Sequence, residues 1–214
     1  MNFKPISLLP ARERVAAELR KAILSSQYKE GDILTLDGLS KLLGVSITPV
    51  REAFQLLSAE GLIKLRPNKG AMVLGVNEKF IRDHFELRVI LESEMVKKVC
   101  ENLKLDISGI CAVHESAKQE IENGYFENYS NYNQAFHMAI WKAADNARIL
   151  AILGGLWNGL SMEQHTTEKD YAIKSFHEHH EMVIAIKARD AHLAYNLMRS
   201  HIIRSQHDML THVL

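Results

Sequence analysis

The sequence predicts a mainly α-helical protein with two parts, an N-terminal winged helix-turn-helix over residues 1–75 and an all-helical bundle over residues 76–214. Three observations predict this class. Apolar residues recur at helical spacing through most of the chain, a glycine turn separates two short helical patterns near residue 44, and an extended pattern occurs only around residues 62–76.

Charge and histidine content support a division near residue 75. Residues 1–75 hold eleven Lys and Arg against seven Asp and Glu, an excess of +4, whereas the remainder holds fifteen against nineteen, an excess of −4. All eleven histidines follow residue 76. The start of the chain lacks an apolar signal-peptide core, and the longest nearly apolar run, residues 149–162, is too short to span a bilayer. We expect a cytoplasmic protein that does not associate with membranes.

The first part contains three predicted helices and a hairpin. The helices are expected within residues 8–27, over 36–43, and from an N-cap at Ser46 to about Glu60. Gly44 is expected to end the second helix in the left-handed conformation. Residues 62–76 form two short extended runs that turn at Arg66-Pro67-Asn68-Lys69-Gly70. Together these elements predict a helix-turn-helix with a wing.

The second part contains six predicted helical segments. Their breaks are expected near residues 104–108, 123–124, 145–146, 166–170 and 189–190. The run 149–162 holds Gly154, Gly155 and Gly159, which would allow close helix packing, either beside a ligand cavity or without a function.

The third helix carries residues that suit DNA reading. A recognition helix places short polar side chains at its N-terminus and a long cation one turn later, within reach of base edges and phosphates. Ser46, Thr48 and Arg51 occupy these positions. The hairpin tip adds further candidate DNA contacts, namely Arg66, Asn68, Lys69 and Gly70. Alternatively, Arg51 forms an ion pair with Glu52 or Glu60 on the surface of an ordinary three-helix fold.

Residues 12–75 resemble the GntR family of bacterial regulators, because VSITPVREAFQLLSAEGLI and the wing sequence RPNKG match its pattern. The resemblance implies a transcription regulator that binds double-stranded DNA. This chain departs from the pattern at Ile47, where members usually carry Arg. If that Arg normally reads a base or a phosphate, this chain is expected either to recognise a different base there or to bind DNA more weakly. Ile47 could instead contact a thymine methyl group.

Residues 78–214 resemble the FadR-type C-terminal domain of that family in three segments, FELRVILESEM, NQAFHMAIWKAADN and EHHEMVIAIKARDAHLAYNLMRSHI. Many members hold a divalent metal with one Asp and three His. The corresponding residues here are Asn133, His137, His179 and His201, each on an apolar helical stripe. Asn133 is a second departure, because an amide oxygen brings no charge. The donor set suits Zn²⁺ or Ni²⁺, with weaker binding than a carboxylate would give.

The resemblance also implies a small carboxylate effector anchored by the metal, and Arg88 on the first helix of the second part could clamp it. A buried ion pair of Arg88 with Glu92 or Glu86 is the alternative. Two neighbouring histidines have weaker claims to the metal: His177 is expected to face solvent, and His180 lies at the edge of a stripe. Six are expected on the surface: His84, His114, His165, His192, His207 and His212.

The sequence therefore favours a homodimeric regulator that places two recognition helices on a near-palindromic operator and responds to a small acid. A second hypothesis makes the helical domain only a metal-stabilised dimerisation scaffold. A third, a metal-dependent hydrolase, is disfavoured because no HExxH motif is present and because Glu178 and Glu181, the neighbours of His179, are expected to point elsewhere.

Overall fold

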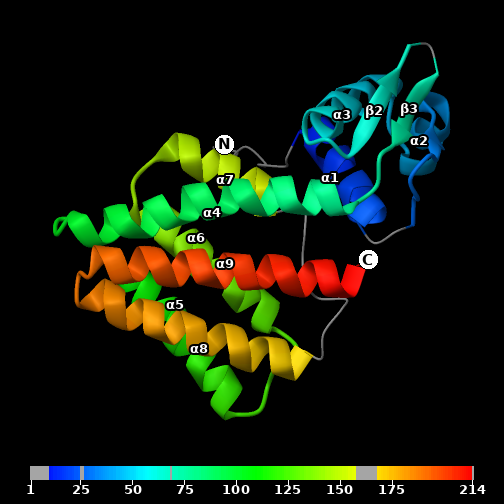
Figure 1. Ribbon diagram of the computed structural model, residues 1–214. Helices are drawn as coiled ribbons and strands as arrows, with labels where there is room; N and C mark the ends of the chain where they lie inside the picture. Colours follow the sequence, from blue (N-terminus) through cyan, green and yellow to red (C-terminus); the bar gives the residue numbers. More distant parts are fainter. Residues whose placement is uncertain (1–9, 25–26, 68, 158–167, 214) are drawn as a thin grey trace, which may run out of the picture. The chain divides into compact units, whose positions relative to one another are not determined.

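The computed structural model describes residues 10–24, 27–67, 69–157 and 168–213. Its contacts divide the chain into two compact units that meet between Phe80 and Ile81. The first unit contains three helices and a small sheet, and the second contains long helices packed side by side (Figure 1). The predicted fold class, a winged helix-turn-helix followed by a helical bundle, is confirmed.

The helices of the first unit begin and end close to the predicted residues. They are α1 (Ala11–Leu24), α2 (Leu36–Leu43) and α3 (Ile47–Ala59). The side chain of Thr35 caps α2 by accepting a hydrogen bond from the backbone N–H of Gly38 at 3.2 Å. Gly44 follows α2 with φ of 64°, the left-handed conformation that was predicted. Ser46 precedes α3 with an extended backbone, but its side chain makes no capping hydrogen bond.

A three-stranded antiparallel sheet completes the first unit. Its strands are β1 (Ile33–Leu34), β2 (Ile63–Arg66) and β3 (Gly70–Val73), in the order β1-β3-β2. The β2–β3 pair is the predicted hairpin, with Arg66 opposite Gly70, and the sequence did not predict β1. The helices and the sheet enclose an apolar core that includes Val15, Leu19, Ile23, Val50, Phe54, Leu57, Leu62, Ile63 and Val73.

The second unit has the six predicted helices. They are α4 (Glu78–Glu101), α5 (Ser108–Glu122), α6 (Tyr129–Ala143), α7 (Ala147–Trp157), α8 (Glu168–Lys187) and α9 (Ala191–Val213). Helices α8 and α9 form a hairpin, and α8 also packs against α5 and α6 (Figure 1). Large buried side chains, among them Phe136, Ile140, Trp141, Met182, Ile186, Met198 and Ile202, fill the space between these helices.

Hydrogen bonds join the turn between α8 and α9 to the end of α4 and the loop that follows it. Arg189 adopts a left-handed backbone with φ of 57° at this turn. Its guanidinium donates to the backbone carbonyl of Val99 at 2.7 Å and to that of Leu105 at 3.2 Å. Because a carbonyl in the last turn of a helix lacks an intrahelical donor, the bond to Val99 satisfies a group that would otherwise need water.

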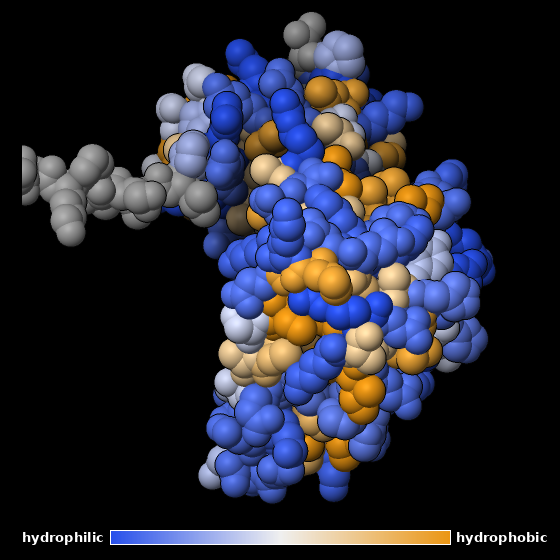
Figure 2. Space-filling model, turned by 90° about the vertical axis from the view of Figure 1, so that its left-hand side faces the viewer, coloured by the Kyte–Doolittle hydropathy of each residue, from blue (hydrophilic) through white to orange (hydrophobic). Residues whose placement is uncertain are grey.

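Apolar side chains also reach the surface, as the orange areas among the blue ones in Figure 2 show. In the second unit the exposed large side chains include Leu87 and Ile90 on α4 and Ile184 on α8. Among the described residues, none of the helices is long and apolar enough to cross a bilayer.

Candidate DNA-reading helix and metal centre

The N-terminal end of α3 presents the predicted reading residues to solvent. Ser46, Thr48 and Arg51 are exposed, and 38% of the surface of Ile47 is exposed. The opposite face of α3 carries Val50, Phe54 and Leu57, which are buried in the core. The helix is therefore held by its apolar face, and its polar face is available for a DNA groove.

Glu60, one of the two acids considered as ion-pair partners of Arg51, is bound by a different arginine. Arg20 on α1 donates from Nε and Nη2 to the two carboxylate oxygens of Glu60, at 2.7 and 2.5 Å. Within the described part of the chain, the ion pairs do not include one between Arg51 and Glu52. This arrangement favours a solvent-facing Arg51 over the surface ion pair.

The wing carries two of its predicted contacts at exposed positions, Arg66 and Lys69. Asn68, also predicted to contact DNA, lies outside the described residues. Gly70 has φ of +83°, and a Cβ at this position would lie 2.0 Å from the backbone carbonyl oxygen of Leu34. Gly70 is thus required where β3 passes β1, and its contact with DNA stays a prediction.

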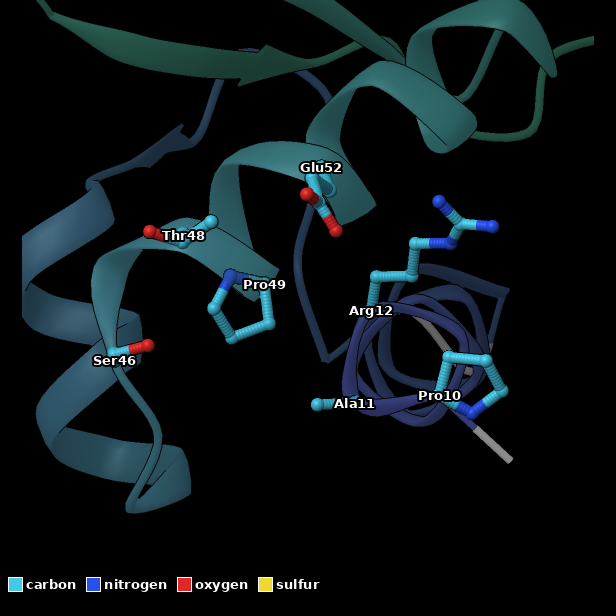
Figure 3. A pocket seen from close by; sticks show the side chains of 7 residues that line it. All are labelled: Pro10, Ala11, Arg12, Ser46, Thr48, Pro49 and Glu52. Carbon is cyan, nitrogen blue, oxygen red and sulfur yellow. The ribbon is translucent and has the colours of Figure 1, made fainter. Parts of the chain in front are cut away.

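An open cavity of about 570 Å³ lies between the start of α1 and the start of α3. Figure 3 shows Ser46, Thr48 and Pro49 on the α3 side and Pro10 and Ala11 on the α1 side. The N-terminal ends of two helices therefore border one concave surface, and the oppositely charged side chains Arg12 and Glu52 also line it.

In the second unit, three histidines from three helices converge. His137 on α6, His179 on α8 and His201 on α9 each offer a ring nitrogen, and these three atoms lie within 4.8 Å of one another. Their exposed fractions are 0%, 3% and 3%. Three buried imidazoles at such short range are costly to desolvate unless something satisfies their nitrogens.

The Nδ1 atom of each ring lies within hydrogen-bond distance of a different polar side chain. His137 Nδ1 lies 2.5 Å from Glu92 Oε2, and His201 Nδ1 lies 2.6 Å from Glu178 Oε2. His179 Nδ1 lies 3.4 Å from the hydroxyl of Tyr129. Carboxylates that accept from Nδ1–H fix the tautomer that leaves a lone pair on Nε2, as the outer partners of metal-binding histidines do.

The Nε2 atoms then face one another as acceptors. His137 Nε2 and His201 Nε2 are 3.1 Å apart, about the separation of two nitrogens that each lie ~2.1 Å from a shared metal. His179 Nε2 is buried and, among the described residues, has no hydrogen-bond partner. Two lone pairs this close repel each other, so a cation between them would remove the repulsion and also satisfy His179.

Asn133, the predicted fourth ligand, lies on α6 four residues before His137, and both are buried. Its Nδ2 donates to the hydroxyl of Tyr171 at 2.8 Å. The Oδ1 atom is buried and has no hydrogen-bond partner within the described ranges. One oxygen and three imidazole nitrogens therefore fit a divalent transition metal by the chemistry of the donor set.

Burial and the two carboxylates set the ionisation states. Burial lowers the pKa of His137 and His179, and it lowers that of His201 to about 4, although Glu178 opposes the last shift. Burial alone would raise the pKa of Glu92, but Arg88 and His137 outweigh it and bring that pKa to about 2. The rings are therefore neutral and Glu92 is charged at neutral pH, as metal binding requires.

Arg88 forms the ion pair that was the alternative to an effector clamp. Its Nε donates to Glu92 Oε1 at 2.7 Å within helix α4, while Glu86 is exposed. The guanidinium carbon also lies 4.5 Å from the ring centre of Trp157 at the end of α7. Glu92 consequently joins Arg88 to the ring of His137.

Comparison with known proteins supports both units. Residues 11–73 match the family of bacterial regulatory proteins called the gntR family, and residues 83–204 match the FCD domain. The chain is 33% identical over 192 residues to the gluconate operon transcriptional repressor of Bacillus subtilis (strain 168), covering 83% of this chain and 76% of the relative.

The chain belongs to the GntR family.

Other members agree with this assignment. The gluconate operon repressor of Bacillus licheniformis is 30% identical over 192 residues, covering 84% of this chain and 77% of that one. The solved structure of Escherichia coli McbR/YncC superposes with a TM-score of 0.69 at 22% identity, covering 92% of this chain and 96% of that one. GntR-family proteins with an FCD domain are transcription regulators and not enzymes, so this chain is a DNA-binding regulator.

Two surface assignments made for this GntR-family chain are wrong. His84 and His114 are buried, with 7% and 6% of their surfaces exposed. His84 lies on the inner face of α4 beside Phe85 and Arg88, and His114 stacks on Phe176 with ring centres 4.9 Å apart. Polar residue type alone predicted exposure, but the apolar faces of long helices enclose both rings. His177, His180, His192 and His207 are exposed, and the side chains of His165 and His212 lie outside the described residues.

Sequence reasoning also missed the groups that position the ligands. Glu178 was expected to point away from the site, because it precedes His179 on the same helix. Its Oε2 lies 2.6 Å from Nδ1 of His201 on α9, and Arg204 holds the carboxylate there, because the Nε of Arg204 donates to its Oε1 at 2.9 Å. Its pKa is lowered to about 2, because the bonds from His201 and Arg204 outweigh burial. Only the knowledge that α8 packs against α9 could have identified Glu178 as a partner of His201.

Proposed function

We propose that this chain is a homodimeric regulator that binds a near-palindromic operator. Its affinity for the operator would change, in either direction, when a metal-anchored small carboxylate binds the helical unit. The observation that carries the proposal is the convergence of His137, His179 and His201, with two orphaned donors, His179 Nε2 and Asn133 Oδ1. Buried polar atoms are costly to leave unsatisfied, and one cation bound by both atoms would satisfy them.

For DNA, the proposal gives α3 the reading role. Ser46, Ile47, Thr48 and Arg51 would face the major groove, and the wing residues Arg66, Lys69 and Gly70, with Asn68, would contact the backbone or minor groove. One unit of this size reads a half-site, so two copies related by a two-fold axis would read a near-palindrome. Selection from a random DNA pool followed by sequencing tests this: asymmetric sites without a repeated half-site would contradict it.

For the metal, Zn²⁺ or Ni²⁺ suits one amide oxygen and three imidazoles. Bound there, the ion would supply an electrophilic anchor for an anion. Element analysis of protein purified without a metal-affinity column should find about one such ion per chain. His179→Ala should lose it, whereas His177→Ala, which changes an exposed ring on the same helix, should keep it. Equal metal content in the two variants would remove His179 from the ligand set.

For the effector, we infer a small organic acid, with sugar acids such as gluconate as first candidates, because two relatives are repressors of a gluconate operon. Arg88 is beside the site, and among the described residues only its Nε has a hydrogen-bond acceptor. A thermal-shift series with gluconate and with neutral glucose, each with and without chelator, tests the role of the acid. The expected result is stabilisation by the acid that disappears on chelation.

The ion pair of Arg88 with Glu92 favours a second candidate, a helical unit whose metal is structural and which has no effector. A buried, satisfied pair needs no anion. This scaffold function predicts stabilisation by metal alone and no response to any acid in the same series.

A further inference from the structure

A second pair of histidines lies outside the candidate metal centre. His114 on α5 and His180 on α8 have ring centres 5.2 Å apart, with an angle of 28° between the ring planes. Helices α5 and α8 pack against each other, so the two rings lie across the contact between these helices. Both rings are distinct from the converging group of His137, His179 and His201.

The buried ring of this pair has an unsatisfied nitrogen. His114 has an exposed fraction of 6%, whereas His180 faces solvent. His114 stacks on Phe176 with ring centres 4.9 Å apart, and this contact packs the flat face of the imidazole. Stacking does nothing for Nε2, which is buried and has no hydrogen-bond partner among the described residues. Because a buried polar atom is costly to leave unpaired, Nε2 of His114 calls for a ligand.

The arrangement of the pair matches one inside the candidate metal centre. His137 and His201 have ring centres 5.1 Å apart and an angle of 32° between their planes, and their Nε2 atoms are 3.1 Å apart. Two imidazoles with this separation and angle can therefore share one ion, and imidazole nitrogen is a common ligand of zinc, nickel and copper. The exposed ring of His180 can adjust its rotamer to complete the pair.

We propose that His114 and His180 bind a second divalent transition-metal ion, which water ligands complete and which joins α5 to α8. The inference goes beyond the proposed function, because neither ring takes part in the first centre. With two protein donors this ion is held more weakly than one with four, so the site fills only at a higher metal concentration. The stability of the helical unit then responds to metal over two concentration ranges, because an ion that binds only the folded chain stabilises it.

Titration of metal-free, full-length protein with Zn²⁺ in a calorimeter at neutral pH tests the proposal. The wild type should show a tight binding event and a weaker one. His179→Ala should lose the tight event and keep the weaker one, which separates this site from the proposed metal centre. His180→Ala, which changes an exposed ring, should lose the weaker event and keep the tight one.

A buried-ring variant and a matched control complete the series. His114→Phe removes Nε2 but keeps a ring to stack on Phe176, so it should also lose the weaker event. His192→Ala removes an exposed histidine from α9 and should keep both events. If His114→Phe does not fold, NMR of the ring nitrogens in the His179→Ala chain replaces it: Zn²⁺ should shift the signals of His114 and His180 and leave those of His192 in place.

The outcomes are distinct. A His179→Ala chain that binds no Zn²⁺ would overturn the second site. A weaker event that survives His114→Phe would also overturn it, even if His180→Ala abolishes that event, because the ion would then bind His180 with other surface groups. A wild type that shows only the weaker event, lost in both His114→Phe and His180→Ala, would support the second site and contradict the proposed metal centre.

Discussion

Arg51 stands one turn into α3 with its side chain exposed, while Glu60 is already held by Arg20. A guanidinium in that place can reach a phosphate or a guanine edge. Arg51→Ala is expected to weaken operator binding by about 1–3 kcal/mol and to make the plot of log affinity against log salt shallower by about one. Fluorescence anisotropy at several salt concentrations measures both quantities.

Lys21→Ala is the control for that prediction, because it also removes one exposed positive charge from the first unit. It lies in the last turn of α1, away from the start of α3. If both variants change affinity and salt dependence equally, the effect belongs to overall charge and not to Arg51.

His84 makes stability depend on pH. Burial, with help from Arg88, lowers its pKa from 6.5 to about 3 in the folded chain. Because the unfolded chain binds the proton more readily, this contribution is complete above pH 6.5 and is lost as the pH falls from 6.5 toward 3. Between pH 7.5 and 5.5, the metal-free wild type should lose about 1.4 kcal/mol more unfolding free energy than His84→Gln. Urea unfolding at the two pH values measures this difference.

An exposed histidine provides the comparison. His192→Gln, on the surface of α9, should lose as much unfolding free energy between the two pH values as the wild type does. A wild type and a His84→Gln variant with the same pH dependence would mean that His84 becomes protonated without cost.

At the same scale, the resemblance to the FadR-type domain proposed the metal ligands, and helical periodicity supported them, because each of the three histidines shares a face with apolar residues of its own helix. It could not identify Glu92 or Glu178 as their partners. Each bond joins two helices, and the bonded residues are 45 and 23 positions apart in sequence. Periodicity carries no information on which helices become neighbours.

At the scale of elements, the wing depends on one glycine. Gly70→Ala would place a Cβ 2.0 Å from the carbonyl oxygen of Leu34 on a backbone with φ of +83°. The strand contact and the left-handed backbone both oppose the substitution, so we expect the first unit to lose at least about 1–3 kcal/mol of unfolding free energy. Loss of protection of the amides of β1 and β3 in hydrogen exchange would locate the damage.

Gly109→Ala is the matched control in α5, where a new Cβ would meet nothing within 4 Å. Alanine favours a helix by roughly 0.5–1 kcal/mol over glycine, so this variant should be as stable as the wild type or slightly more so. A Gly70→Ala chain with wild-type stability would show that β3 can shift away from β1.

The same strand pair explains one element that the sequence did not predict. The hairpin over residues 62–76 has two alternating runs around a glycine turn, which local pattern detects. Strand β1 has only two residues, Ile33 and Leu34, and exists because β3 offers it a free edge. A pairing of two residues across about forty positions of chain leaves no periodic signal.

At the scale of the whole molecule, the change in charge and histidine content near residue 75 anticipated a division that the contacts place between Phe80 and Ile81. The two boundaries differ because the first residues of α4, which begins at Glu78, belong to the first unit. Phe80, in this first turn, packs on the core of the first unit. Composition indicates where along the chain the type of binding partner changes, whereas side-chain packing determines where one hydrophobic core ends.

Reading a near-palindrome requires two copies of the chain, and α4 offers a surface for their contact. Leu87 and Ile90 lie three residues apart on one face of this helix and are 48% and 53% exposed. Paired apolar side chains on a helix face are more costly to leave in water than isolated ones, so we expect a second copy to cover them.

If the proposed dimer forms through this face, the wild type should have twice the 24.3 kDa chain mass in light scattering after size exclusion. The double variant Leu87→Glu with Ile90→Glu should shift it toward a monomer. Ile184→Glu is the matched control: Ile184 is also 53% exposed, but on α8 with exposed polar neighbours, His180 and Glu181. It should stay dimeric. Because each half-site contact would then form independently, the monomeric variant should bind a full operator no more tightly than a single half-site. A double variant that remains a dimer would place the two-fold contact on another face of the helical unit.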